Sequence, residues 1–555
     1  MAMAAAALSV SVAPRALSSG DIRTARVVVV GNGPAGLAAS GLLGGHWPFY
    51  VNRHPDAAFD AAVRSQQQAV AAATGRAAAD VSLLELNLAE LAAIPLARQG
   101  RSNNPIALLV DSLLHPNADG QHGSSFPQDL TCLETRHLPE RAVEHVVVGS
   151  GPAGGSWAKM APSTQTLSPG FWMGLPGLPL TAGGKEMGRV SRQMVAEYYA
   201  KYSDRFVGAG RTVGGRVTAL SRQEGGHGWR LTINMNGSGS GDQHEEQGGV
   251  EEEEVLLHAT DAVLLATGMY DRPRRLETTA LAEVGKDNSG VASPVRVGYR
   301  CPHDWKAAKG RPHRVLVVGA GLSASDCIVS AISNGWHVSH VFRTTAAETK
   351  LGSKFGRPSG MYAEYYHLTQ LMHGEKRSEL YSPFPRSTLM GVHSESGACT
   401  VRDDASGKEG VVAPVDRVVA LVGSTPDLAF VRGGGGGPGG SAGQDGAAYG
   451  ACALAAAAAA ARGGDGEASM LLGTGQRPLV AGAPLAASEA PSGGKKATHP
   501  VYVAVDPYTL EARGALAGEG GGGLFAAGPL RGDNFVRFVL GDAWPLVQRL
   551  HGLAS

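Results

Sequence analysis

Cysteine is scarce in this chain, and its cysteines form no close pair. The 555 residues include five cysteines, and no two stand at the C-x-x-C spacing of a zinc site or a dithiol redox centre. We therefore expect no metal site, no disulfide framework and no dithiol centre. Such cysteine usage is typical of a reducing compartment, and we expect the cytoplasm.

An excess of one charge and a long apolar run are also lacking. Lys+Arg and Asp+Glu both number 49, so the formal net charge is zero. A general nucleic-acid or membrane-surface binder would carry a basic excess, so we expect no nucleic-acid partner. No apolar run reaches the roughly 20 residues of a membrane span, so we expect no transmembrane segment. Hydrophobic residues make up 43% of the chain, enough for large cores.

Three segments have a composition unlike the rest. Residues 1–25 are rich in Ala and Ser with one acid, as in a disordered tail or an organelle transit peptide. The second reading would place the protein in the chloroplast or mitochondrion. Residues 426–500 are Gly/Ala-rich, and residues 236–254 end in four glutamates. We expect disordered or flexible insertions there, because large apolar side chains are too few to offset the ordering entropy.

The remaining chain alternates Val/Leu-rich strands with helical stretches, which predicts an α/β fold with parallel sheets. The strands are expected at 26–31, 144–149, 261–266, 313–318, 338–342 and 416–422, and the helices at 34–44, 190–204 and 322–334. A further hairpin is expected around 236–254, between strands at 229–233 and 255–258. We predict two Rossmann-like dinucleotide-binding domains, an FAD domain from 26–270 and 501–555 and an NADPH domain over 271–425 inserted in it.

The first glycine turn follows the strand at 26–31 and reads Gly31-Asn32-Gly33-Pro34-Ala35-Gly36. Its three glycines permit, in order, a tight turn, close approach of a pyrophosphate and close packing of helix on strand. The pyrophosphate would lie at the helix N-terminus, where N–H groups and the dipole favour an anion. An acid is expected about 20 residues further on, to bind a ribose hydroxyl. After the strand expected at 49–51 the chain instead reads Asn52-Arg53.

A second cluster, residues 149–157, contains Gly155 and Trp157. The segment that follows, up to Leu180, is rich in Pro and Gly, so it should not continue as a helix. We interpret it as a loop lying against the flavin, with Trp157 and Trp172 as flat apolar walls. The alternatives are a third Rossmann turn or a plain packing loop.

The third cluster is a variant of the fingerprint in which alanine replaces the last glycine. It contains Gly319, Gly321, Ser323 and Ala324. The next strand ends at Arg343, where an NAD site would prefer an acid. A cation there suits a 2′-phosphate, which favours NADPH. The alternative for Arg343 is an ordinary surface arginine.

Other glycine-containing strand ends complete the pattern. Thr267 and Gly268 end one strand, and residues 418–426 have the same character. Either segment could cross beside a cofactor or be an ordinary buried strand ending in a turn. Near the C-terminus a strand is expected to end at Gly528, after which Asp533 should cap a helix.

Five stretches resemble the oxidative stress-induced growth inhibitor family, which is related to flavin-dependent monooxygenases. They are residues 28–43, 100–114, 152–178, 421–430 and 524–538. The resemblance implies FAD on Gly31, Gly33 and Gly36, with Asp533 near the ribityl chain. It implies NADPH on Gly319, Gly321, Ala324 and Arg343.

The implied reaction is NADPH reduction of FAD, formation of a flavin hydroperoxide from molecular oxygen, and transfer of one oxygen atom to a small-molecule substrate. The family is also associated with growth and cell-division control. Asn534 and Arg537 could steady the peroxide or NADPH, or could simply cap a helix and carry surface charge. Alternative functions are a catalytically weak regulatory protein on the same fold and an NADPH oxidase-like peroxide producer. The residues do not indicate the substrate, the catalytic groups or the oligomeric state.

Overall fold

The computed structural model divides the chain into two compact units. Unit 1 comprises Met1–Lys159, Ser168–Met269 and Pro426–Ser555, and unit 2 comprises Met160–Leu167 and Tyr270–Thr425. Unit 2 is therefore inserted in the sequence of unit 1. The structure describes residues 22–94, 102, 104–116, 131–181, 188–223, 228–235, 253–276, 295–302, 305, 313–355, 362–393, 396–431, 503, 505–513 and 522–553. Residues 1–21 of the expected tail and most of the insertions 236–254 and 426–500 lie outside these ranges.

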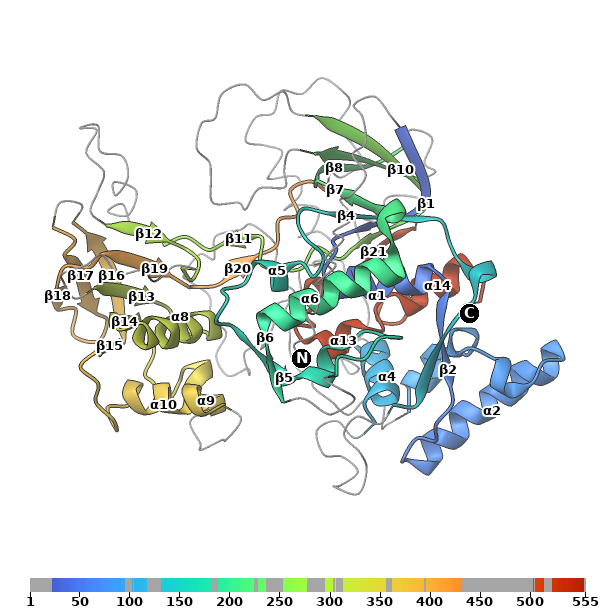
Figure 1. The fold of residues 1–555 in the computed structure, drawn as a ribbon, viewed down its shortest axis with the longest axis horizontal. Helices are drawn as coiled ribbons and strands as arrows, with labels where there is room; N and C mark the ends of the chain where they lie inside the picture. Colours follow the sequence, from blue (N-terminus) through green and yellow to red (C-terminus); the bar gives the residue numbers. More distant parts are fainter. Residues whose placement is uncertain are drawn as a thin grey trace, which may run out of the picture. The chain divides into compact units, whose positions relative to one another are not determined.

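Unit 1 is built on a parallel sheet with the strand order β7, β4, β1, β10 and β21 (Figure 1). These strands span Thr212–Gly214, His145–Gly149, Ile22–Val30, Glu254–Leu265 and Leu524–Ala526. The valines of β1 and β4 are buried, as expected for strands covered on both faces. The first half of β10 pairs antiparallel with β9 (Trp229–Asn234), which pairs with β8 (Arg216–Arg222). This confirms the hairpin predicted around 236–254.

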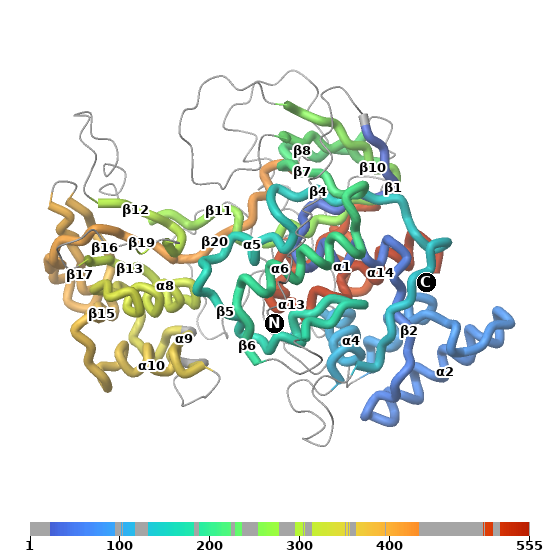
Figure 2. Tube along the Cα trace, in the orientation of Figure 1, coloured from blue at the N-terminus to red at the C-terminus, as the bar shows by residue number. Residues whose placement is uncertain are grey.

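Helices from both ends and from the middle of the described chain pack in the core of unit 1. They are α1 (Pro34–Leu43), α6 (Arg192–Tyr202), α13 (Val536–Val539) and α14 (Trp544–Leu550). The C-terminal helices α13 and α14 lie beside the N-terminal helix α1 (Figure 2). The two ends of the described chain therefore share one core, which contains Leu37, Leu43, Val539 and Trp544.

An insertion separates α1 from β4. It contains β2 (His46–Tyr50), α2 (Ala57–Thr74), α3 (Leu88–Ala92), α4 (Pro105–Leu114) and β3 (Leu133–His137). β2 pairs antiparallel with β3 in a sheet of their own. The parallel neighbours of β1 are instead β4 and β10. The segment after residue 51, where a ribose-binding acid was expected, therefore follows a strand that does not lie beside β1 in the sheet.

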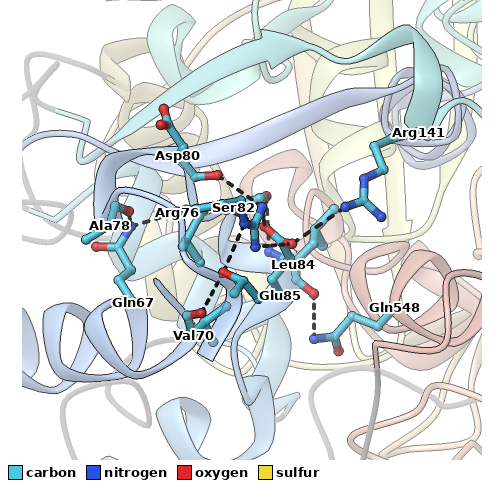
Figure 3. A network of polar contacts seen from close by, with 12 residues as sticks. Gln67, Val70, Arg76, Ala78, Asp80, Ser82, Leu84, Glu85, Arg141 and Gln548 are labelled. Atoms are coloured by element: carbon cyan, nitrogen blue, oxygen red, sulfur yellow. Dashed lines mark hydrogen bonds and ion pairs between the residues drawn. The ribbon is translucent and has the colours of Figure 1, made fainter. Parts of the chain in front are cut away.

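A polar network joins this insertion to α14 (Figure 3). Arg76 pairs with Glu85 at 2.8 Å, and the other carboxylate oxygen of Glu85 accepts the Ser82 backbone N–H at 2.9 Å. The Gln548 side chain of α14 donates to the Leu84 backbone oxygen at 3.1 Å. Each bond satisfies a polar group in a largely buried turn, where leaving it unpaired would be costly.

Unit 2 has a second parallel sheet, in the order β12, β19, β13, β14 and β15. These strands span Arg296–Gly298, Arg417–Ala420, Arg314–Val318, His337–Phe342 and Tyr381–Pro385. Helix α8 (Leu322–Ser333) packs on β13 and β14, and is followed by α9 (Lys350–Phe355) and α10 (Ala363–Met372). Small antiparallel sheets are formed by β16 (Ser387–Val392), β17 (Cys399–Asp403) and β18 (Glu409–Val412), and by β11 (Arg272–Pro273) with β20 (Ser424–Thr425).

The predicted fold class is confirmed, since two Rossmann-like α/β units are present and the second interrupts the first. A strand or helix lies at each expected position. Several boundaries shift by a few residues, and one matters for the tail: β1 begins at Ile22, so residues 22–25 extend the strand and do not belong to the tail. None of the helices in the described ranges has the length and apolarity needed to cross a membrane.

Candidate dinucleotide sites

The first glycine turn joins β1 to α1, and its three glycines differ in whether the surrounding structure would tolerate a side chain. Gly31 has φ +118°, and a Cβ there would overlap the Ala266 carbonyl oxygen. A Cβ on Gly36 would overlap the Gly31 carbonyl oxygen. By contrast, a Cβ on Gly33 would have just one described neighbour, the Gly155 Cα at 4.0 Å. The fold itself thus requires Gly31 and Gly36, whereas Gly33 leaves space open beside the turn.

The N-terminus of α1 is available to an anion. Gly33 is the N-cap and supplies no side-chain cap, Pro34 occupies the first turn, and that turn contains no acid. The first N–H groups of a helix lack intrahelical partners. With the helix dipole, they form a site that suits a phosphate.

The loop after β4 lies directly on this turn. Asn32 donates through Nδ2 to the Gly151 carbonyl at 2.7 Å, and its own carbonyl accepts the Gly154 N–H at 2.9 Å. Gly155 has φ +58°, and a Cβ there would lie 3.0 Å from the Gly33 Cα. Trp157 packs partly buried against the core.

The expected break in helical structure after this loop is confirmed. The helix α5 (Ser156–Lys159) has just four residues. A flavin-facing role for the loop stays a prediction.

Two further strand ends meet the same turn. Thr267 and Gly268 follow β10, and the Thr267 hydroxyl is buried without a hydrogen-bond partner among the described residues. Gly528 follows β21 with φ +66°, and a Cβ there would lie 3.4 Å from the Ala35 Cβ. Residues far apart in the sequence are therefore brought together at the carboxyl edge of this sheet, as a dinucleotide site requires.

The second glycine turn, between β13 and α8, repeats this construction. Gly319 has φ +117°, and a Cβ there would overlap the Leu421 carbonyl oxygen. Gly321 is the N-cap of α8 without a side-chain cap, and a Cβ there would meet no described atom within 4 Å. Ala324 is fully buried and Ser323 is exposed. The fold thus requires glycine at 319 and leaves space open at 321.

A buried histidine supports this turn from the neighbouring strand. The His340 Nε2 lies 2.7 Å from the Gly319 carbonyl oxygen, and Nδ1 lies 2.8 Å from the Tyr381 hydroxyl. Burial lowers the pKa of His340 to about 4. The ring is therefore neutral near pH 7, and its Nε2–H donates to the Gly319 carbonyl.

Two arginines lie at the carboxyl edge of the second sheet. Arg343 directly follows β14, as predicted, and is exposed. Arg386 directly follows β15 and is also exposed. The backbone N–H of Arg386 donates to the backbone carbonyl of Thr344 at 3.2 Å. The main chain at Arg386 therefore lies beside the residue that follows Arg343. Sequence reasoning missed Arg386, whose one local signal is its position directly after a strand.

Comparison with known proteins identifies the family, although no family model matches the chain. The chain is 30% identical to human oxidative stress-induced growth inhibitor 1 over 545 residues, which cover 94% of each protein. It is 27% identical to human oxidative stress-induced growth inhibitor 2, over 93% of this chain and 91% of that protein. The chain belongs to the oxidative stress-induced growth inhibitor family.

Among solved structures, the bacillithiol disulfide reductase YpdA from Bacillus cereus is similar at 12% identity and a TM-score of 0.49, over 95% of this chain and 100% of that one. A flavin monooxygenase from Stenotrophomonas maltophilia is similar at 14% identity and a TM-score of 0.46, over 96% of this chain and 99% of that one.

In this family member, a buried polar network extends from Gly528 to Asp533. The Gly528 N–H donates to Asp542, which forms an ion pair with Arg531. Arg531 also donates to the Asn104 Oδ1 at 2.7 Å, and the Asn104 Nδ2 donates to Asp533. Burial raises the pKa of Asp542 to about 7, against the opposing effect of Arg531.

The network corrects one prediction about Asp533. Helix α13 begins at Val536 after Phe535, with no side-chain cap, so Asp533 does not cap it. Instead its carboxylate is buried and accepts the Asn104 amide. Burial also raises the pKa of Asp533. A role toward a ribityl chain stays a prediction, as does any cofactor role of Asn534.

Within the described ranges, no group of three or more His, Cys, Asp or Glu side chains is placed to hold a metal ion. The residues brought together are those that suit phosphate groups: helix N-termini, open glycines and exposed arginines.

Proposed function

We propose that this chain is an FAD-dependent monooxygenase reduced by NADPH, which inserts one atom of molecular oxygen into a small-molecule substrate. The observation that carries the proposal is the repeated turn. In each unit, one glycine is required by the fold and the next leaves an open face at an uncapped helix N-terminus. A chain with one such turn would suit a single dinucleotide, whereas two suit an enzyme that uses two.

The residues of unit 1 fit FAD. The pyrophosphate would lie at the N-terminus of α1, in the space that Gly33 leaves open. The buried Thr267 hydroxyl would gain a partner, which removes the cost of an unpaired polar atom. When bound, FAD supplies the redox chemistry: it accepts a hydride and reacts with oxygen.

The residues of unit 2 fit NADPH. The pyrophosphate would lie at the N-terminus of α8 beside Gly321, and Arg343 would bind the 2′-phosphate. Arg386 would add a second positive charge at the same edge. Neutral His340 would stabilise the turn by its hydrogen bond to the Gly319 carbonyl. Its role would therefore be to position the turn and not to contact the nucleotide.

Water exclusion would come from aromatic side chains around the loop after β4. Trp172 lies under the Arg537 guanidinium, with 4.2 Å between the Arg537 Cζ and the ring centroid. Arg537 is buried and pairs with Asp111 at 3.5 Å. These contacts would fix the position of the Trp172 ring. They would also hold the Arg537 guanidinium in a site from which water is excluded. A link to oxidative-stress or growth control is proposed from the names of the relatives alone.

The test uses purified full-length protein. FAD should give a bound-flavin absorbance spectrum, which NADPH should bleach without oxygen and which air should restore. Gly33→Val should lose the flavin while remaining folded, whereas Gly410→Val, at an exposed glycine with open space in β18, should keep it. Protein that FAD cannot reconstitute would refute the proposal and favour a regulatory role. Release of one peroxide per NADPH with every candidate substrate would favour a peroxide producer.

A further inference from the structure

An aspartate and a histidine meet at the C-terminal end of α4. The His115 Nδ1 lies 3.1 Å from the Asp111 Oδ1, and the His115 backbone N–H donates to the Asp111 carbonyl at 2.7 Å. The two side chains are 9% and 8% exposed. Because an ionised carboxylate only accepts hydrogen bonds, Nδ1 carries a proton. Nε2 has no hydrogen bond to any residue in the described ranges, so it is the nitrogen left to bind or release a proton.

Charged groups from the neighbouring segments bear on this dyad. Arg537 of α13 pairs with the other Asp111 carboxylate oxygen at 3.5 Å. Asp533, in the segment before α13, is close enough to repel the Asp111 carboxylate. Glu90 of α3, which also packs on α4, is exposed. An imidazolium at His115 would be stabilised by Asp111 and by the C-terminus of α4, which His115 caps, against the opposing charge of Arg537.

The dyad lies among segments that the proposed function places around the flavin. The Phe171 ring, in the 3-10 helix η6 (Gly170–Met173), stands edge-on to the His115 ring with 6.4 Å between the centroids. η6 belongs to the loop expected to lie against the flavin. At the other end of α4, the N-cap residue Asn104 donates to Asp533, which is expected near the ribityl chain. The inference below therefore rests on the proposed function.

The proposed reaction consumes a proton. NADPH, oxygen, the substrate and one proton give NADP⁺, the oxygenated product and one water. NADPH delivers one hydrogen as a hydride, so the second hydrogen of that water must arrive as a proton. A site that excludes water needs a side chain to deliver it.

We propose that the Nε2 of His115 supplies this proton and that Asp111 is its positioning residue. The N–H bond at Nε2 breaks while an O–H bond forms on the oxygen atom that leaves as water, and the bonding electrons stay on the nitrogen. The neutral ring then regains a proton from solvent. Asp111 fixes the ring through Nδ1 and stabilises its charged form.

A chemical footprint tests the placement of His115 without measuring turnover. Diethyl pyrocarbonate acylates neutral imidazole nitrogens, and mass spectrometry locates the modified histidines in the full-length protein. FAD, in a sample whose spectrum shows bound flavin, should suppress acylation of His115. Acylation of His367, an exposed histidine of α10, should be unaffected. Equal acylation of His115 with and without bound flavin would overturn the proposal.

The role of His115 is tested by removing its ring. In His115→Ala, recovery of the reduced flavin in air should slow by about a hundredfold or more, as for loss of a general acid. Bleaching by NADPH without oxygen is the internal control, because hydride transfer needs no proton. Imidazole added to the buffer should restore the recovery, which it cannot do for a misfolded protein. The matched control is His137→Ala, at an exposed histidine of β3, which should need no imidazole.

The possible failures are distinct. Protein without a flavin spectrum would refute the proposed function itself. Flavin-loaded His115→Ala that recovers at the unmodified rate, or whose slow recovery imidazole leaves unchanged, would overturn the role of His115 alone.

The role of Asp111 is tested by the pH dependence of the same recovery. Asp111→Asn keeps the shape of the side chain and removes its charge, so the imidazolium loses its negative partner. The pH above which recovery slows should therefore be lower in Asp111→Asn than in the unmodified protein. Asp204→Asn, at an exposed aspartate of unit 1, should keep the unmodified profile. An unchanged profile in Asp111→Asn would contradict the positioning role.

Discussion

Arg531 and Asp542 form an ion pair whose side chains are 1% and 2% exposed. Asp542 also accepts the Gly528 backbone N–H, and Arg531 also donates to Asn104. The pair thus ties the segment after β21 to α4 and to the end of the chain. Because both charges are buried, removing either one leaves the other without its ion-pair partner.

Removing one partner should therefore be costly. We expect Asp542→Ala to lower the free energy of unfolding by ~3–5 kcal/mol, measured by urea unfolding followed by tryptophan fluorescence. The control is Asp261→Ala, which breaks the Arg26–Asp261 pair, whose side chains are 44% and 31% exposed. That change should cost at most ~1 kcal/mol. Equal losses of unfolding free energy in the two variants would show that the buried pair stabilises the protein no more than the exposed pair does.

The glycines of the second turn should separate folding from binding. Gly319→Ala adds a Cβ at φ +117° against the Leu421 carbonyl, and we expect a loss of more than ~2 kcal/mol in stability. Gly321→Ala adds a Cβ in open space, but alanine is a poorer N-cap than glycine, so we expect a smaller loss of at most ~1 kcal/mol. NADPH binding, followed by isothermal titration, should nevertheless weaken in Gly321→Ala. A stable Gly319→Ala protein would contradict this assignment.

The two turns also show what the sequence could and could not predict. At Gly319 the next strand in sequence, β14, is also the neighbour of β13 in the sheet, so Arg343 follows the expected neighbouring strand, and its binding role stays a prediction. At Gly31 the next strand, β2, leaves the main sheet, and β4 takes the place beside β1. Local patterns specify strands and turns, but strand pairing across a long insertion depends on tertiary packing.

The same reason explains why the buried polar network was not predicted. Asn104 and Asp542 meet through Arg531, although they lie far apart in the sequence. Nothing in the residues around either one indicates this meeting. Asn104 does lie in the stretch 100–114 that resembles the family, which was a signal of importance without a role.

Acidification should weaken unit 2 through His340. Its pKa is about 4 in the folded protein because of burial, against about 6.5 in an unfolded chain. The unfolded state therefore binds the proton first, and stability is lost as the pH falls from about 6.5 toward 4. We expect His340→Gln to reduce this loss by on the order of 1–3 kcal/mol.

The check is urea unfolding at several pH values within that window. His367→Gln, at an exposed histidine of α10, should keep the pH dependence of the unmodified protein. Asp542 acts with the opposite sign, because burial raises its pKa above the usual value, so its contribution declines as the pH rises. The free energy of unfolding is therefore compared between variants at each pH. If it depends on pH in His340→Gln as it does in the unmodified protein, the prediction is contradicted.

Arg343 and Arg386 should together set the preference for NADPH over NADH. Each arginine directly follows a strand at the carboxyl edge of the sheet, and a charge-assisted bond to a phosphate contributes roughly 1.5–3 kcal/mol. We expect Arg343→Gln and Arg386→Gln each to raise the Kd for NADPH about tenfold or more, with little change for NADH. Arg377→Gln is the matched control, because Arg377 is exposed but precedes β15, at the opposite edge. Equal weakening of both nucleotides would mean that these arginines support the fold and do not recognise the 2′-phosphate.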